Sequence, residues 1–261
     1  MKRIIMITTP VLNIDEQIKR VACISDIHGN LEALSAVFHD IQDKGIENIL
    51  CVGDVVGYGA DPGPCIDIMR NNNILTVQGN HDSYVCSDRG MDTINSAAFK
   101  SIVWTREHVS DQQKEWLARL PLIINFDKFS VVHGSLSNPD RWEYVLDVAQ
   151  SERCFLVQDK PFTIIGHSHR PYLYSELDGK ITGEVLHTKE FGKRGKYIIN
   201  AGSVGQPRDK QYLATYLIFE VMNRTASIER VAYDVETAKR KILESGLPAH
   251  NAKRLSPSVI M

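Results

Sequence analysis

Side chains of the metal-binding types recur where five apolar runs of this chain end. The polar segments that follow these runs are Ser25–His28, Gly53–Asp54, Gly79–Asp82, His133–Gly134 and Gly166–His169. Their imidazole, carboxylate and amide groups suit transition metals such as Mn, Fe, Co, Ni or Zn, whereas calcium prefers a site made only of oxygen atoms. The side chains concerned are those of Asp26, His28, Asp54, Asn80, His81, His133, His167 and His169.

The spacing of these residues favours a site for two metals. In extended backbone, residues two apart face the same side, so the pairs Asp26/His28 and His167/His169 are each predicted to bind a metal from one side. Seven of these eight residues, all except His81, are candidate ligands, which exceeds the four that a tetrahedral zinc needs. They are enough for two metals about 3.5–4 Å apart, as in many phosphoesterases. A lone Asp after a strand is usually a turn or cap residue, but five such ends in order favour one common site.

The first 80 residues predict alternating strands and helices that could bring these ends together. Val21–Ser25, Ile49–Val52 and Ile74–Val77 are apolar runs typical of buried strands. Leu31–Lys44 has apolar residues at helical spacing, and Pro64–Arg70 is a helix that opens on proline. This βαβ order is typical of an α/β layer, in which ligands bind beyond the carboxyl ends of the strands.

The remaining chain predicts further helices and a second sheet. We expect helical structure over Thr93–Leu120 and Asp147–Gln158, and strands at Leu122–Phe126, Phe129–Val132 and Thr163–Ile165. After Pro171, short strands suggest a second, more antiparallel sheet, followed by a helix at Val235–Glu244. These strands are Tyr172–Ser175, Lys180–Leu186, Lys196–Ile199, Tyr212–Phe219 and Thr225–Ala232.

Bulk composition indicates an ordinary globular protein. The chain has 261 residues, of which 43% are hydrophobic and 24% charged. Thirty basic residues against 32 acidic ones give a net charge of −2, so we expect no bulk nucleic-acid binding. No run approaches the roughly 20 apolar residues of a membrane span, and the five cysteines form no C-x-x-C pair. We therefore expect a cytoplasmic protein with no membrane partner. No feature indicates an oligomeric state.

Five motifs resemble those of the calcineurin-like metallophosphoesterase superfamily. They are DIH, GDVVGYG, GNHD, VVHGS and GHSH, in the family's order, and the likeness spans about Val21–Phe219. The segments NAGSVGQPRD and GDVVGYGADP resemble the bacterial YfcE-like or diadenosine-tetraphosphatase-related branch. The resemblance implies an α/β fold, a four-layer α/β/β/α sandwich of two mixed sheets flanked by helices. We divide the chain into an N-terminal arm (1–20), a single domain (21–245) and a polar C-terminal tail (246–261).

The resemblance also implies a distribution of ligands over two metal ions, with Mn or an Fe/Mn pair favoured. Asp26, His28 and His169 would hold one metal, and Asp54 would bridge both. The second metal would be held by Asn80, His133 and His167. Two cations that share a water lower its pKa, giving hydroxide that attacks phosphorus.

Two neighbouring residues are the expected catalytic pair. His81 is the candidate general acid, because imidazole titrates near neutral pH. Asp82 could accept the other ring proton of His81, or it could cap the helix that follows the strand. For Asn30, an N-cap of the following helix is the favoured role over one near the metals.

The expected function is hydrolysis of small, nucleotide-type phosphodiesters or phosphomonoesters. Gly57 and Tyr58 stand where protein phosphatases of the superfamily have Asp and Arg, which weakens a Ser/Thr protein phosphatase interpretation. A dinucleoside polyphosphate hydrolase is the main alternative, and a non-catalytic scaffold is the least favoured because no ligand position is lost. Possible phosphate contacts, or simply surface residues, are Arg141, Arg170 and Arg208; Trp142 and Tyr144 could stack on a base or pack in the core.

Overall fold

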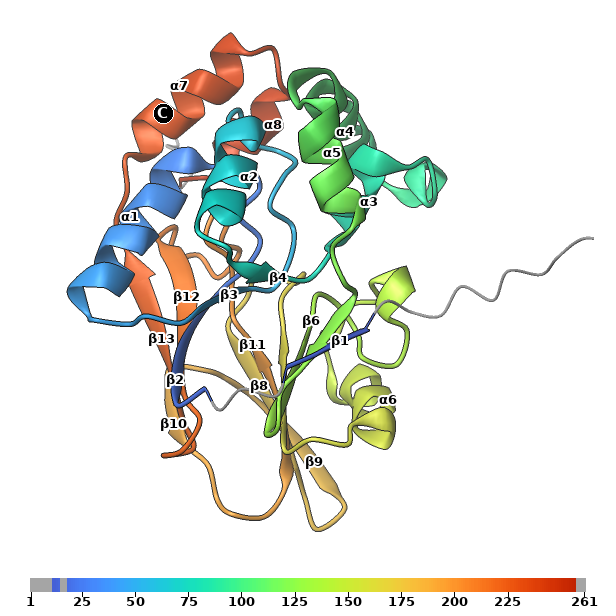
Figure 1. Cartoon of the computed structure of the whole chain (residues 1–261), viewed down its shortest axis with the longest axis vertical. Coiled ribbons are helices and arrows are strands. Elements are labelled where there is room, and N and C mark those ends of the chain that lie inside the picture. The colour runs from blue at the N-terminus through green and yellow to red at the C-terminus, as the bar shows by residue number, and fades with distance from the viewer. Residues whose placement is uncertain (1–10, 15–17, 257–261) are drawn as a thin grey trace, which may run out of the picture.

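Two β-sheets face each other in the centre of the molecule, with helices on the outer face of each sheet (Figure 1). The computed structural model describes residues 11–14 and 18–256. The four layers are the α/β/β/α arrangement that the sequence motifs predict. Within the described residues, none of the helices combines the length and the apolar character needed to cross a membrane.

One sheet has seven strands in the order β1-β5-β6-β7-β11-β8-β9. β6, β7 and β11 run parallel to one another, and β8 and β9 extend this sheet by antiparallel pairing. The strands are β1 (Val11–Asn13), β5 (Ile123–Asn125), β6 (Phe129–Val132), β7 (Phe162–Ile165), β8 (Tyr172–Leu177), β9 (Lys180–Val185) and β11 (Lys196–Asn200).

The other sheet has six strands in the order β10-β13-β12-β2-β3-β4. β2, β3 and β4 are parallel, and β12 joins them by pairing antiparallel with β2. The strands are β2 (Arg20–Ile24), β3 (Ile49–Cys51), β4 (Leu75–Thr76), β10 (Thr188–Glu190), β12 (Ala214–Glu220) and β13 (Thr225–Val231).

The strands after Pro171 do not form a sheet of their own, contrary to the sequence-based expectation. β8, β9 and β11 complete the seven-stranded sheet, whereas β10, β12 and β13 complete the six-stranded one. Both sheets contain strands from before and after Pro171, because β7 pairs with β11 in one sheet and β2 pairs with β12 in the other. Periodicity predicts the strands but carries no information on which sheet they join.

Alternating side chains on β2 show how the layers are held together. Val21 and Cys23 belong to the apolar core between the sheets, and Ala22 and Ile24 belong to the core beneath the helices. A strand with apolar residues on both faces is what a sheet covered on both sides requires. The helices are α1 (Leu31–Asp43), α2 (Pro62–Asn71), α3 (Asn80–Cys86), α4 (Ser96–His108), α5 (Asp111–Ala118), α6 (Val148–Val157), α7 (Val235–Glu244) and α8 (Ala249–Lys253).

The two ends of the chain are more structured than the sequence predicts, where the structure describes them. Within the arm, β1 adds a parallel strand beside β5; residues 1–10 and 15–17 lie outside the described residues. Within the predicted polar tail, Ala252 of α8 and the flanking residues Leu247 and Leu255 are buried against α7. Asn251, which is 1% exposed, donates hydrogen bonds to the carbonyl of Tyr58 and the hydroxyl of Ser101. α8 is therefore anchored to the loop after β3.

Candidate metal centre

The motif residues lie just beyond the strands, and at five of them the backbone turns into the left-handed region. β2 ends at Ile24 and β7 at Ile165. The residues with positive φ, between 52° and 66°, include Asp26, His28, Asp54, His167 and His169. The expectation that D-x-H and H-x-H lie in extended backbone is therefore wrong. Non-glycine residues with positive φ cost about 1–3 kcal/mol each and cluster at functional sites; here they turn the paired side chains toward one centre.

The first group of side chains is Asp26, His28 and His169, whose candidate ligand atoms all lie within 4.8 Å of one another. Nε2 of His169 is 3.2 Å from Oδ1 of Asp26 and 3.1 Å from Nε2 of His28. All three residues are at most 2% exposed. Residues 141 positions apart in the sequence thus converge in one buried cluster.

The second group is Asp54, His133 and His167, again with ligand atoms within 4.8 Å of one another. Oδ2 of Asp54 lies 3.2 Å from Nε2 of His133 and 3.7 Å from Nε2 of His28. This single oxygen therefore lies between the two groups. A carboxylate in this position could be shared by two cations.

Three buried polar atoms of the predicted metal ligands have no hydrogen-bond partner among the described residues. They are Oδ1 of Asp26, Oδ1 of Asn80 and Nε2 of His133. Buried polar groups are nearly always hydrogen-bonded, so an orphaned atom needs an explanation. Asn80 is the first residue of α3 and is 7% exposed. Bound cations would satisfy all three atoms, and the donor set of imidazole, carboxylate and amide oxygen fits transition metals.

Backbone carbonyls orient three of the histidine rings. Nδ1 of His28 bonds to the carbonyl of Val56 at 3.0 Å, and Nδ1 of His133 to that of Val52 at 2.7 Å. Nδ1 of His169 bonds to the carbonyl of Gln206 at 2.6 Å. A carbonyl only accepts, so each Nδ1 carries a proton, and each neutral ring presents the lone pair of Nε2 to the centre. This outer arrangement fixes the tautomer that a metal requires.

Burial keeps most of these imidazoles neutral. Burial lowers the pKa of His167 to about 3 and that of His81 to about 4, and it lowers the pKa values of His28 and His169 as well. His133 differs. Burial would lower its pKa, but the adjacent Asp54 carboxylate outweighs burial and raises the pKa to about 9. Neutral imidazole is the form that binds metals, so the site is largely prepared for them.

His81 lies beside the first group, with its ring packed between Tyr58 and His28. The ring centroids of His81 and Tyr58 are 4.5 Å apart, and those of His81 and His28 are 4.8 Å apart. Its backbone N–H donates to Oδ1 of Asp54 at 2.8 Å, and its Nδ1 is buried without a partner. Gly57, at φ +92°, leaves room for the ring: a Cβ there would lie 2.3 Å from Nδ1 of His81.

Asp82 accepts backbone N–H groups rather than a proton of the His81 ring. Its Oδ2 accepts from the backbone N–H groups of Asp54 and Gly79, and its Oδ1 accepts from those of Val55 and Val56. The side chain is fully buried. Asp82 thus closes the start of α3 and holds the loop that carries Asp54. The capping role was the alternative that the sequence left open.

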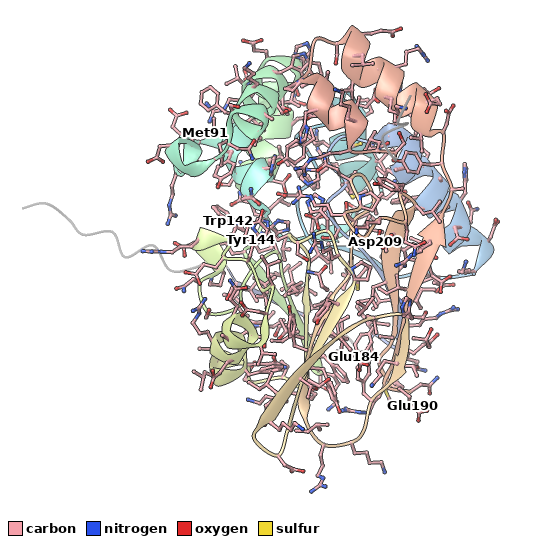
Figure 2. All side chains as sticks on the ribbon, turned by 180° about the vertical axis from the view of Figure 1, so that it is seen from behind. Met91, Trp142, Tyr144, Glu184, Glu190 and Asp209 are labelled. Carbon is pink, nitrogen blue, oxygen red and sulfur yellow. The ribbon has the colours of Figure 1, made fainter. Side chains whose placement is uncertain are left out.

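Other residues singled out by sequence also have defined positions. Asn30 caps α1 by accepting from the N–H of Ala33. Trp142 is 8% exposed and donates to the carbonyl of Gln78, so it packs. Tyr144 stacks on His167 with ring centroids 3.8 Å apart, and Figure 2 shows it close to Trp142 above the strands. Tyr58 and Tyr144 therefore flank the histidines, which spacing alone could not predict.

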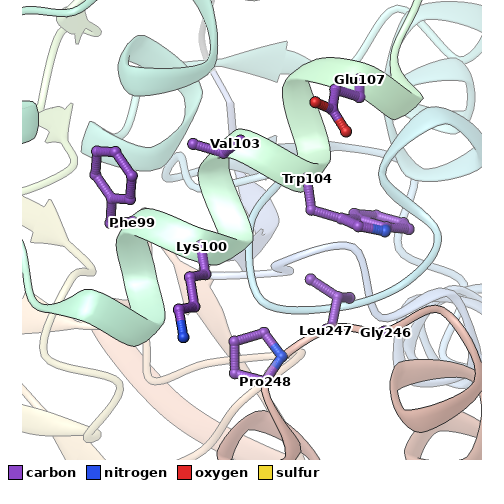
Figure 3. A pocket seen from close by; sticks show the side chains of 8 residues that line it. All are labelled: Phe99, Lys100, Val103, Trp104, Glu107, Gly246, Leu247 and Pro248. Carbon is purple, nitrogen blue, oxygen red and sulfur yellow. The ribbon is translucent and has the colours of Figure 1, made fainter.

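A cavity of about 390 Å³ lies away from this centre, between α4 and the connection from α7 to α8 (Figure 3). It is lined by apolar side chains such as Phe99, Val103 and Trp104, with Lys100 and Glu107 as the charged residues. None of the strand-end residues lines it. The loops beyond the strands, not this cavity, hold the groups that can do chemistry.

Comparison with known proteins places this constellation in context. The model of the calcineurin-like phosphoesterase superfamily domain matches residues 20–224, which include all the side chains described above from Asp26 to His169. An uncharacterized protein of Methanocaldococcus jannaschii is 39% identical over 241 residues, which cover 90% of this chain and 96% of that protein.

Solved structures agree with the fold. A metallophosphoesterase from Sphaerobacter thermophilus is 32% identical, with a TM-score of 0.80 over 90% of this chain and 98% of its own. A hypothetical protein of Pyrococcus horikoshii shares the fold at 21% identity, with a TM-score of 0.74 over 91% of this chain and 97% of its own.

Proposed function

Because the chain belongs to the calcineurin-like phosphoesterase superfamily, we propose that it hydrolyses small phosphodiesters or phosphomonoesters of the nucleotide type with two bound transition-metal ions. The observation that carries this proposal is the position of Asp54. Its Oδ2 lies within 3.7 Å of His28 in one group and of His133 in the other. A buried carboxylate between two sets of imidazoles suits two cations better than one.

Each residue has a defined part in holding the ions. Asp26, His28 and His169 would hold one ion, and Asn80, His133 and His167 the other, with Asp54 shared. When bound, the pair supplies an activated water and positive charge that offsets the charge of the phosphate. Manganese or an iron–manganese pair is our preferred assignment. These ligands suit several transition metals, so the supply of each metal in the cell also decides which one is bound.

His81 is our candidate proton donor to the leaving oxygen. It is held by packing against Tyr58 and by the N–H bond to Asp54, not by Asp82. Burial lowers its pKa to about 4, so the ring is neutral near pH 7 without substrate. A phosphate anion beside the ring favours the protonated imidazole and moves its pKa upward toward the working range.

The proposal is tested with p-nitrophenyl phosphate and bis-p-nitrophenyl phosphate as substrates. We expect the protein loaded with Mn²⁺ to hydrolyse at least one of them, and chelation to abolish the activity reversibly. His133→Ala should remove it, whereas His39→Ala, at an exposed position on α1, should not. A protein that binds Mn²⁺ and hydrolyses neither these esters nor nucleotides would be a scaffold, and the proposal would be wrong.

A further inference from the structure

A second cavity, of about 440 Å³, lies beside the metal centre and is lined by basic side chains. No carboxylate lines it among the described residues. Pockets of roughly 300–1,000 Å³ are typical of small-molecule sites. We call its basic residues the basic cluster; they are Arg170, Arg208, Lys210, His250, Lys253 and Arg254.

Backbone hydrogen bonds connect the basic cluster to His169, a member of the first group of candidate ligands. Arg170 directly follows His169, and its Nε donates to the carbonyl of Arg208 at 3.3 Å. The N–H of Arg208 donates to the carbonyl of His169 at 3.1 Å, and the carbonyl of Gln206 bonds to the His169 ring. The wall of this cavity is therefore continuous with a residue of the metal centre.

Two side chains of the cluster lie near the same tyrosines that flank the histidines. The charges of Arg208 and Arg254 both act on the hydroxyls of Tyr58 and Tyr144. Those two rings pack against His28, His81 and His167. Nε of Arg208 is buried and has no hydrogen-bond partner. Positive charge therefore lies next to the tyrosines that flank the centre, and Arg208 has a buried donor without an acceptor.

No carboxylate of the described residues neutralises the positive charge of the cluster. The structure gives no carboxylate partner within 4.0 Å to Arg170, Arg208, Lys210, Lys253 or Arg254 among the residues it describes. The neighbouring Asp209 is paired with Arg230 at 2.7 Å. Five such cations in one cavity stand out in a chain of net charge −2. α8, anchored through Asn251, brings Lys253 and Arg254 to this place.

We propose that the basic cluster binds a second phosphate group of the substrate, linked to the phosphate that is hydrolysed. The inference rests on the proposed function for the first phosphate and narrows its substrate class to compounds with two or more linked phosphates, such as nucleoside polyphosphates. Arginine and lysine are the residues that recognise phosphate oxygens. A small substrate fits better than a nucleic acid, because the positive charge is confined to one cavity of about 440 Å³.

Binding of inorganic pyrophosphate to the metal-free full chain tests the subsite without turnover. By calorimetry, we expect pyrophosphate to bind at least about tenfold more tightly than inorganic phosphate. Lys253→Gln/Arg254→Gln changes two exposed side chains and should remove this preference. Lys193→Gln/Arg194→Gln is the matched control. It removes the same charge from exposed positions between β10 and β11, near Glu190 at the far end of the sandwich (Figure 2), and should preserve the preference.

The Mn²⁺-loaded enzyme gives a second readout. The ratio of kcat/KM for ADP to that for p-nitrophenyl phosphate should fall about tenfold in Lys253→Gln/Arg254→Gln, and remain unchanged in the control. Equal effects of both variants, or no preference for pyrophosphate, would overturn the subsite while leaving the phosphoesterase proposal intact. Tighter binding of a short single-stranded oligonucleotide than of pyrophosphate would also overturn it, in favour of nucleic acid. Failure of the Mn²⁺-loaded wild type to hydrolyse either p-nitrophenyl ester or any nucleotide would instead contradict the proposed function.

Discussion

The Oδ2 atom of Asp54 lies 3.2 Å from Nε2 of His133, and both side chains are almost completely buried. The other oxygen of Asp54 accepts the backbone N–H of His81 at 2.8 Å. One carboxylate thus faces the ligand atoms with one oxygen and positions the candidate acid with the other. Changes at Asp54 should affect metal content and catalysis together.

Asp54→Asn removes the charge while keeping the shape of the side chain. We expect fewer than two metal ions per chain, and a fall in kcat/KM of at least about 100-fold, since even outer residues of metal sites contribute 10–100-fold. Elemental analysis of the loaded variant and assay of the same sample measure both. His39→Ala, prepared and loaded with metal in the same way, is the control and should keep both metal content and activity. Two full equivalents of metal in Asp54→Asn would contradict the shared role of this carboxylate.

Metal binding should release a proton from His133. Its pKa is raised from the ordinary value near 6.5 to about 9 because the Asp54 charge outweighs burial. Below pH 9 the metal must therefore displace this proton, so metal affinity rises with pH by about tenfold per unit from pH 6.5 to 9. Because the pKa of His133 is higher in the folded chain than in the unfolded one, the His133–Asp54 pair stabilises the metal-free fold below pH 6.5. This stabilisation is lost as the pH rises through 9. Calorimetry in buffers of different ionisation enthalpy counts the proton; affinity independent of pH would refute this assignment.

His81→Gln separates catalysis from metal binding. If His81 is the proton donor, turnover of substrates with poor leaving groups falls about 10²–10⁴-fold and metal content is unchanged. The p-nitrophenyl esters should be less affected, because their leaving group needs little protonation. A parallel loss of metal would show instead that His81 is a ligand, since His28, Asp54 and His81 also lie within 4.8 Å of one another.

Gly57→Ala tests whether the room left for the His81 ring is needed. The added Cβ would lie 2.3 Å from Nδ1 of His81, at a backbone φ of +92°. We expect turnover to fall with metal content retained, and the free energy of unfolding to drop by about 1–3 kcal/mol. Gly45→Ala is matched for positive φ, at +62°, but its Cβ meets nothing within 4 Å. It should lose stability without losing activity.

Much of the fold was predictable because local patterns determine strands and helices. The structure has α1 at Leu31–Asp43 and α7 at Val235–Glu244, close to or at the predicted bounds. The sheet assignment after Pro171 could not be predicted, because pairing depends on long-range contacts that periodicity does not report. α8 was also missed: a helix of five residues has too short a pattern, and its stability comes from packing of Leu247, Ala252 and Leu255.

The candidate site divides in the same way. Residue types and order were enough to select Asp26, His28 and His169, which the fold brings within 4.8 Å of one another. The predicted extended backbone at these residues was wrong, because left-handed turns direct their side chains toward the centre. Asp82 and Tyr144 needed the structure, since a backbone hydrogen-bond network and a ring stack leave no sequence pattern.

Crystals of the protein soaked in Mn²⁺ give the most direct test of the dinuclear centre. An anomalous difference map at the manganese edge should contain two peaks about 3.5–4 Å apart, with Asp54 between them. Asp26, His28 and His169 should surround one peak, and Asn80, His133 and His167 the other. A single peak, or two peaks that do not share Asp54, would contradict the account.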